Sequence, residues 1–242
     1  MPNTESKGWR RLPVVYVKEG SSGWNRERFR AAIDFRPRHQ LFGVIAHRRH
    51  ELAQIAPYHR HESYDEHLAK TESTKVDASK ISIPPRYGAL LYSLAKESGA
   101  RFVMEAGSGF GISTMYLAAA VGQKRRHGIF SFEIADYAEI AQESVGIITP
   151  NAKIVHDNCL KLSCYIPADF RCDFAFIDAQ HDHENIIKTY NTMLGWMAPG
   201  HLIVIDDIQY SGSSRAAWKK IALSRDDRFV ALINNRLGVI AT

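Results

Sequence analysis

A short segment of the chain places three glycines at alternate positions between an apolar run and a helical pattern. It reads VMEAGSGFGIST over residues 103–114. Glycines in such a place allow a sharp turn and let backbone N–H groups approach a ligand at a helix N-terminus. A dinucleotide fingerprint would need glycine at the position of Ile112, so the pattern disfavours a pyrophosphate.

Two glutamates sharpen the prediction for the ligand. Glu133 ends the next apolar run, where a carboxylate can accept both hydroxyls of a ribose. Glu105 lies beside the glycines, where it can hold a cationic ammonium group and would repel a phosphate. The segment therefore predicts a ligand that contains an adenosine.

Three further carboxylates end two other apolar runs. Asp178 ends DFAFID, and Asp206 and Asp207 follow HLIVI. Parallel strands end at one edge of a sheet, about 4.8 Å apart, so these acids converge if the two strands are neighbours. Protonation, basic partners or a bound cation must then offset their repulsion, and oxygen ligands favour Mg²⁺, Mn²⁺ or Ca²⁺. Alternatively, Asp178 positions a ligand and Asp207 caps the next segment.

Repeated strand and helix patterns must position these residues, and they predict an α/β fold with a parallel sheet. Two β-rich runs around Asn234-Asn235-Arg236 predict a closing hairpin, and Pro199-Gly200 predicts a turn before the fifth strand. We expect seven strands, at residues 101–106, 127–133, 152–155, 173–178, 201–206, 229–233 and 237–242. Helices are expected at 82–97, 112–121, 137–145, 184–197 and 214–223.

Residues 1–80 differ in character from residues 81–242. They hold 15 Lys and Arg against 10 Asp and Glu, whereas the rest of the chain holds 16 of each. Helical patterns cover residues 24–35 and 40–55, and residues 57–80 predict a loop or lid. We expect a mainly helical N-terminal cap over 1–80, serving substrate or oligomer contacts, and a ligand-binding domain over 81–242. The scattered positive charge fits a solvated helical face or a nucleic-acid-binding arm.

The glycine segment, Glu133 and the closing strand pair together resemble the class I S-adenosylmethionine-dependent methyltransferases. That resemblance implies a Rossmann-like sheet of order 3-2-1-4-5-7-6, with the last strand antiparallel and helices on both faces. It also implies that Glu133 binds the ribose and that Asp157-Asn158 lie near the adenine, although Asp157 can equally be a turn or helix cap. Around the methionine part of the cofactor it places Gly107, Ser108, Gly109, Gly111 and Ser113, although Ser113 can also be a first-turn hydroxyl that satisfies the helix backbone.

Residues 82–242 resemble, more narrowly, the cation-dependent O-methyltransferases of the catechol and caffeoyl-coenzyme A type and their bacterial relatives. The resemblance lies in FAFIDAQHDHENIIKTYNTMLGWMAPGHLIVIDDI. It implies that Asp178, Asp206 and Asp207 bind a divalent ion. Catechol-type members have Asp-Asn in place of Asp206-Asp207 and Lys in place of His181, and these departures leave the substrate open.

Methyl transfer from a sulfonium needs a deprotonated acceptor oxygen aimed at the methyl carbon. A divalent ion lowers the pKa of a hydroxyl and fixes its oxygen. Asp178 and His181 are therefore candidate catalytic residues, with His181 as general base. The alternative for His181 is a structural role at a helix start.

These observations predict an S-adenosylmethionine-dependent O-methyltransferase that acts on a hydroxyl of a small molecule, such as a vicinal diol or catechol. The alternatives are an RNA-modifying enzyme that uses the basic arm, a metal-independent N-methyltransferase, and a cofactor-binding protein without catalysis. For the small-molecule O-methyltransferase we expect no nucleic-acid partner.

The chain shows no apolar run of membrane-spanning length and no signal-peptide pattern at its N-terminus. We therefore expect a cytoplasmic protein without a membrane partner. Its three cysteines form no Cys-x-x-Cys pair, which argues against a disulfide framework or a thiolate zinc site. A homodimer is expected from the resemblance alone.

Overall fold

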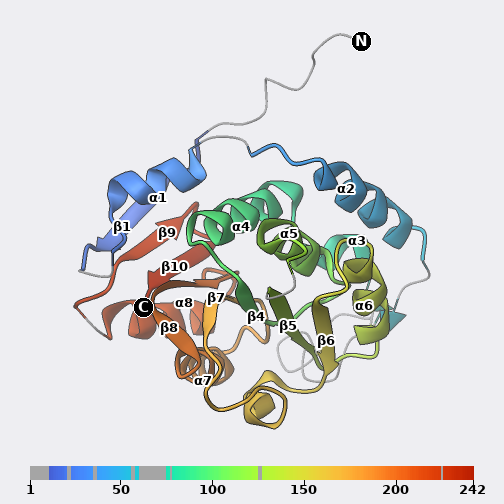
Figure 1. Ribbon diagram of the computed structural model, residues 1–242. Helices are drawn as coiled ribbons and strands as arrows, with labels where there is room; N and C mark the ends of the chain where they lie inside the picture. Colours follow the sequence, from blue (N-terminus) through green and yellow to red (C-terminus); the bar gives the residue numbers. More distant parts are fainter. Residues whose placement is uncertain are drawn as a thin grey trace.

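A mixed sheet of eight strands forms the centre of the computed structural model, in the order β1-β9-β10-β8-β7-β4-β5-β6 (Figure 1). The strands are β1 (Val14–Lys18), β4 (Phe102–Ala106), β5 (Gly128–Glu133), β6 (Ala152–His156), β7 (Cys172–Ile177), β8 (Met197–Ile205), β9 (Val230–Ile233) and β10 (Leu237–Ala241). The structure describes residues 11–20, 23–34, 37–55, 58–59, 75–76, 78–124, 127–224 and 226–242.

The predicted order 3-2-1-4-5-7-6 is confirmed when the sheet is followed from β6 to β9. Strands β4 to β8 pair in parallel, and β10 runs antiparallel to both β8 and β9. The expected number of seven strands was wrong, because β1 adds an eighth, antiparallel to β9. Its residues, VVYVK, are mostly strong β-formers, so the sequence carried a strand signal here that the expected set of seven strands left out.

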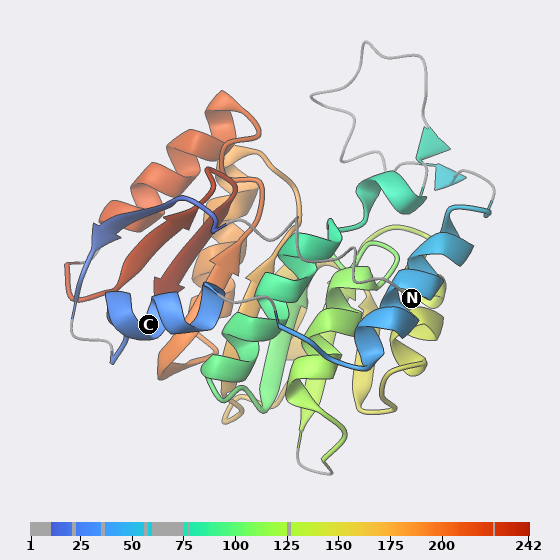
Figure 2. The same cartoon turned by 90° about the horizontal axis from the view of Figure 1, so that it is seen from above.

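Helices cover both faces of the sheet. One face carries α1 (Arg26–Ile33), α4 (Pro85–Glu97), α5 (Ile112–Val121) and α6 (Ala138–Gly146), as Figures 1 and 2 show. On this side α2 (Leu41–Leu52) packs against α5. The other face carries α7 (His183–Leu194) and α8 (Gly212–Leu223), which pack against each other. Strands β4 and β7 are almost fully buried between these layers, which holds their C-terminal ends firmly in place.

Two local predictions need correction. The Pro199-Gly200 pair lies inside β8 rather than before it, and α7 ends at Leu194. Gly200 has a φ of +79°, and the pairing of β7 with β8 shifts register in this region. A glycine in the left-handed region lets the strand bulge and continue, so the turn signal marks an irregular strand.

The N-terminal region is also more closely joined to the sheet than a helical cap would be. Helix α1 packs on α4, and β1 extends the sheet itself. Within the predicted loop, β2 (Tyr58–His59) pairs with β3 (Lys75–Val76), and α3 (Ala78–Ile81) follows. Residues 60–74 of that loop lie outside the described residues.

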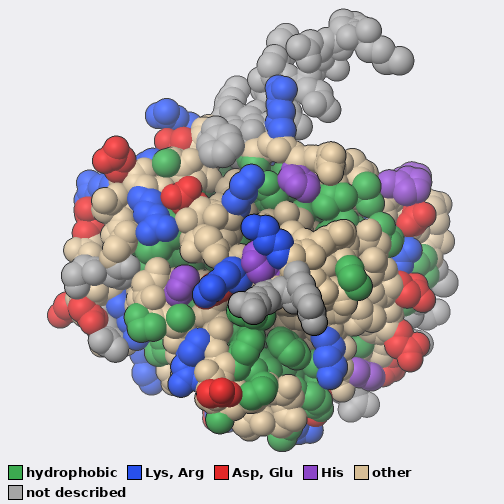
Figure 3. Space-filling model, viewed as in Figure 1, with side chains coloured by type: hydrophobic (Ala, Val, Ile, Leu, Met, Phe, Trp, Pro, Cys, Tyr) green, Lys and Arg blue, Asp and Glu red, His purple; other side chains and the backbone are tan. Residues whose placement is uncertain are grey.

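Positive side chains gather near the middle of the face shown in Figure 3, which is drawn from the same side as Figure 1. Exposed Lys96 and Arg101 precede β4, and exposed Lys124 precedes β5, so all three lie at the edge where the parallel strands begin. The predicted site residues follow the strands and lie at the opposite edge. None of the helices in the described part of the chain is both long and apolar enough to cross a bilayer.

Candidate active site

The glycine segment forms a tight loop between β4 and α5. Gly107, Gly109 and Gly111 all have positive φ, at 86°, 52° and 85°, a region that glycine enters without steric cost. At Gly107 a side chain is also excluded by space, because a Cβ would lie 2.1 Å from the carbonyl oxygen of Asp178. The loop therefore lies directly against the end of β7.

Two buried polar atoms in this region lack a hydrogen-bond partner among the described residues. They are Oε1 of Glu105 and Oγ of Ser108. The other oxygen of Glu105 accepts hydrogen bonds from Thr114 and, at 2.6 Å, from Ser131. Burial raises the pKa of Glu105, and the hydroxyls of Ser131, Thr114 and Ser113 oppose that shift. Because an unsatisfied buried polar atom is costly, these two atoms suit polar groups of a ligand.

Glu133 ends β5 and reaches the glycine loop. Its carboxylate accepts hydrogen bonds from the backbone N–H groups of Gly109, at 2.7 Å, and Ala135, at 3.0 Å. Burial raises the pKa of Glu133 to about 7, although both backbone hydrogen bonds favour the charged form. The predicted ribose-binding carboxylate is thus held beside the predicted methionine-binding loop.

A small hollow opens at the ends of β5 and β6. Its lining includes Gly107, Glu133, Asp157, Asn158, Gln180 and Asn185. Asp157 lies in the wall, but Tyr165 donates a hydrogen bond to one of its oxygens, and the other pairs with Lys161. These partners lower the pKa of Asp157 to about 2. Asn158 caps the following 3₁₀ helix (Cys159–Cys164) by accepting from Leu160 N–H.

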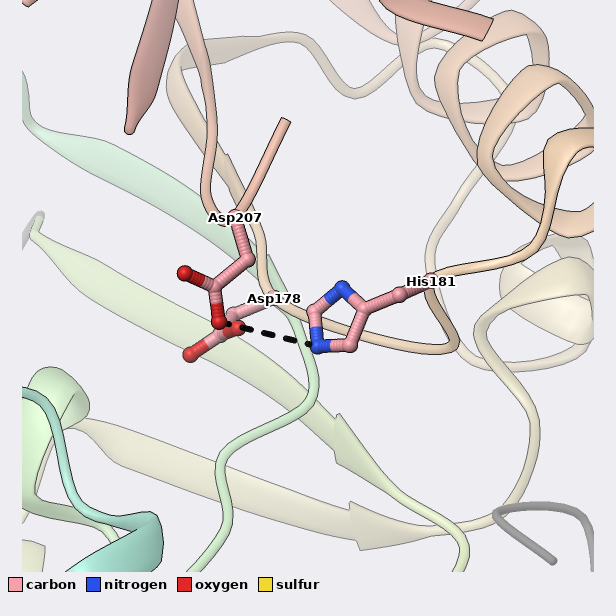
Figure 4. A group of neighbouring side chains, drawn as sticks. All are labelled: Asp178, His181 and Asp207. Carbon is pink, nitrogen blue, oxygen red and sulfur yellow. Dashed lines mark ion pairs between the residues drawn. The ribbon is translucent and has the colours of Figure 1, made fainter. Parts of the chain in front are cut away.

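Asp178, His181 and Asp207 form a second group of site residues, shown in Figure 4. One donor atom from each lies within 4.8 Å of the other two. Nε2 of His181 lies 3.9 Å from Oδ2 of Asp207, and the imidazole packs against the ring of Tyr210. Asp207 has a φ of +50°, which is uncommon for a residue with a side chain. The arrangement can bind a cation or a polar substrate group.

Asp206, predicted as a metal ligand, lies differently from its neighbour. It is 1% exposed, and Nε and Nη2 of Arg236 donate to its two oxygens at 2.7 Å each. One of these oxygens also accepts from the backbone N–H of Asp207. The structure thus brings Asp178 and Asp207 together with His181 and pairs Asp206 with Arg236, whose Nε also lies 3.3 Å from Oδ1 of Asp207.

Charge in this cluster is unbalanced. Three carboxylates face one guanidinium, and burial together with the neighbouring aspartates raises the pKa of Asp178 well above its usual value. Burial also raises the pKa of Asp207 and lowers that of His181, which keeps the imidazole neutral. Burial lowers the pKa of the Arg236 guanidinium, but its hydrogen bonds to Asp206 outweigh that effect. The pKa of Arg236 is therefore raised above its ordinary value. The excess of negative charge suits a divalent cation.

Sequence reasoning did not identify Arg236 or Tyr210 as site residues. Arg236 comes from the turn between β9 and β10, where its guanidinium lies 4.9 Å from the centre of the Tyr87 ring. In the sequence Arg236 could be recognised only as a turn residue, because no spacing rule predicts contact between a hairpin turn and an aspartate 30 residues away. Tyr210 is 57% exposed and carried no signal in the sequence.

Comparison with known proteins agrees with this geometry. A family model described as "Methyltransferase domain" matches residues 104–208. A protein of Mycolicibacterium vanbaalenii that carries the name "Putative O-methyltransferase" is 25% identical over 207 residues, covering 84% of this chain and 82% of its own length.

Two solved structures share the fold. An O-methyltransferase from Bacillus cereus in complex with SAH has a TM-score of 0.55 at 16% identity, covering 90% of this chain and 98% of its own. The SAH-bound methyltransferase PaMTH1 of Podospora anserina has a TM-score of 0.58 at 14% identity, with coverages of 85% and 97%. With the strand order and the matched domain, these likenesses show that the chain has the fold of solved methyltransferases and is similar to S-adenosylmethionine-dependent O-methyltransferases.

Proposed function

We propose that this enzyme transfers the methyl group of S-adenosylmethionine to a hydroxyl of a small molecule, with the help of a divalent cation. The observation that carries the proposal is the cluster of Asp178, His181 and Asp207, whose donor atoms lie within 4.8 Å of one another. The cluster lies beside the glycine loop, since Gly107 abuts the Asp178 carbonyl group. Cofactor and acceptor groups would therefore meet at the ends of β4 and β7.

The residues around the hollow fit the cofactor. S-adenosylmethionine, when bound, supplies a methyl group on a positively charged sulfur. Glu133 would accept hydrogen bonds from the ribose hydroxyls. The two unpartnered atoms have matching roles: Oε1 of Glu105 can accept from the ammonium group, and Oγ of Ser108 can donate to the carboxylate of the methionine part.

The donor set also fits a divalent cation. Asp178 and Asp207 are the carboxylates that would hold it, and their excess negative charge would be offset by it. A divalent ion there would lower the pKa of the acceptor hydroxyl and fix its oxygen. His181 has two candidate roles that exclude each other. A free Nε2 accepts the hydroxyl proton as a general base, whereas a ligating Nε2 completes the donor set.

A small acceptor with vicinal hydroxyls fits this site better than RNA. Two adjacent oxygens can share one cation, which favours a diol or catechol. An RNA acceptor would draw on positive charge near the site, but Lys96, Arg101 and Lys124 lie at the opposite edge of the sheet, and Lys161, beside the hollow, is paired with Asp157.

Two experiments test this proposal. The first is calorimetric titration of S-adenosylhomocysteine into the purified protein, and the second is a methyl-transfer assay on catechols with Mg²⁺, Mn²⁺ or EDTA. We expect a dissociation constant on the order of micromolar and methylation that EDTA abolishes. Asp178→Asn should reduce turnover at least about 100-fold, and Asp169→Asn, at an exposed position, should not change it.

Three results would contradict the proposal. Absence of cofactor binding would remove the methyltransferase assignment itself. Catechol methylation that persists in EDTA and in Asp178→Asn would show that the transfer needs no metal, whereas methylation of amines alone would favour the metal-independent N-methyltransferase. Salt-sensitive RNA binding that the surface substitutions Arg11→Gln and Arg26→Gln weaken in a folded protein would favour the RNA-modifying enzyme.

A further inference from the structure

We infer that His181, rather than Asp206, is the third ligand of the cation, and that this donor set makes the site selective for first-row transition ions over Mg²⁺. The inference rests on the proposed cation assistance. It concerns which residues of the cluster face the ion and therefore which ions the site prefers.

Asp206 is held away from the ligand set by its partners. Both of its oxygens accept from Arg236 in a bidentate pair at 2.7 Å, and one also accepts from the backbone of Asp207. Arg236 is itself fixed, because it stacks on Tyr87 and Asn234 donates to the Tyr87 hydroxyl. Turning Asp206 towards a cation would break the buried pair, which is costly.

His181, by contrast, is directed towards the carboxylates. Hydrogen bonds fix its loop at both ends: Asp178 N–H donates to the Ala106 carbonyl, and Asp182 caps α7 by accepting from Asn185 N–H. Tyr210 packs against the imidazole at 5.2 Å between ring centres. In Figure 4 the ring points towards the Asp178 and Asp207 carboxylates.

The separation of the donor atoms favours a shared ion over direct contact. The 3.9 Å between Nε2 of His181 and Oδ2 of Asp207 is too long for a hydrogen bond. Two ligands of one ion with bonds of about 2.1 Å lie up to about 4.2 Å apart. The gap is therefore of the size that a shared cation would occupy.

The chemistry of the donors then sets the preference among ions. Mg²⁺ prefers an all-oxygen octahedral shell and keeps several waters. An imidazole nitrogen adds affinity for first-row ions in the order Mn²⁺ < Fe²⁺ < Co²⁺ < Ni²⁺. Two carboxylates and one imidazole should hold Co²⁺ more tightly than Mg²⁺, and His181 should account for much of the difference.

The test measures binding of Co²⁺ and Mg²⁺ alone to the metal-free full chain, by calorimetry and by the visible absorption of Co²⁺. In the wild type we expect Co²⁺ to bind at least about 100-fold more tightly than Mg²⁺. His181→Ala should shrink that ratio at least about tenfold and change the Co²⁺ spectrum, with Mg²⁺ affinity nearly unchanged. His183→Ala, two residues along and outside the cluster, is the matched control.

The role of Asp206 is tested with the double variant Asp206→Asn/Arg236→Gln, which keeps the net charge of the cluster. We expect its Co²⁺ affinity to stay within about threefold of wild type, whereas Asp207→Asn should lose at least about 30-fold. Thermal unfolding and S-adenosylhomocysteine binding verify that each variant is folded.

Each contrary result has a distinct meaning. An unchanged Co²⁺ to Mg²⁺ ratio in His181→Ala would overturn the inference and leave His181 as a base. Loss of Co²⁺ binding in the folded double variant would overturn it by making Asp206 a ligand. If neither ion binds the wild type while S-adenosylhomocysteine does, the proposed cation assistance itself fails, and the inference with it.

Discussion

Two carboxylates on neighbouring strands show how surroundings decide the chemistry of a side chain. Glu133 is 2% exposed, and burial raises its pKa to about 7 despite two backbone hydrogen bonds. Asp157 follows the adjacent strand, and Lys161 and Tyr165 lower its pKa to about 2. Asp157 therefore stays ionised and engaged by its own neighbours, whereas Glu133 gains or loses a proton near neutral pH.

We predict from this that cofactor affinity depends on pH through Glu133. The ionised carboxylate is the better acceptor for the ribose hydroxyls, so binding must release a proton wherever Glu133 is protonated. Since its pKa is raised to about 7, affinity for S-adenosylhomocysteine should weaken as pH falls below 7, by up to about tenfold per pH unit. Calorimetry between pH 5.5 and 8.5 measures this dependence.

Glu133→Gln should bind S-adenosylhomocysteine at least about tenfold more weakly at pH 8, with no such slope. Glu139→Gln, at an exposed position on α6, should retain both the affinity and the slope of the wild type. A slope that survives in Glu133→Gln would assign the pH dependence to another group.

Among the elements, the loop between β4 and α5 is the most tightly constrained part of the site. Gly107 takes a φ of +86° and contacts the backbone of Asp178, so the loop and the end of β7 fit together without space for a side chain. Gly99, after α4, takes a similar φ of +69°, but nothing beyond its chain neighbours lies within 4 Å of the place of a Cβ.

Alanine substitutions at these two glycines therefore distinguish the cost of backbone strain from the cost of steric overlap. Gly107→Ala and Gly99→Ala should each lose about 1 kcal/mol through the positive φ. Gly107→Ala should lose at least about 2 kcal/mol more, because the loop or β7 must shift, and should abolish S-adenosylhomocysteine binding. Urea unfolding measures both changes, and equal losses in the two variants would show that the contact at Gly107 is unimportant.

At the scale of the whole molecule, β1 joins the N-terminal region to the main sheet. It pairs with β9, whose four residues are all buried, and α1 packs on α4. The domain boundary expected at residue 80 would thus separate β1 from the sheet to which it belongs. An uncovered β9 would present an apolar edge with unpaired backbone groups.

We accordingly expect deletion of residues 1–20 to destabilise the protein by at least about 2 kcal/mol and to promote self-association. Deletion of residues 1–10, which keeps β1, is the matched control and should leave both properties near wild type. Urea unfolding and light scattering test this, and a stable monomer after the longer deletion would show that β1 is dispensable.

The sequence alone determined the glycine loop and the position of Glu133 at the end of its strand, because these depend on local apolar patterns. The strand order came from the resemblance to the methyltransferases, and it makes neighbours of the strands that end in acids, since parallel strands end at one edge. The same rule brought Asp178 and Asp207 together. The tertiary structure alone decided that Arg236 pairs with Asp206, that His181 lies with Asp178 and Asp207, and that β1 extends the sheet at its edge. These depend on contacts between residues far apart in the chain, and side-chain directions there follow from packing, which no local spacing records.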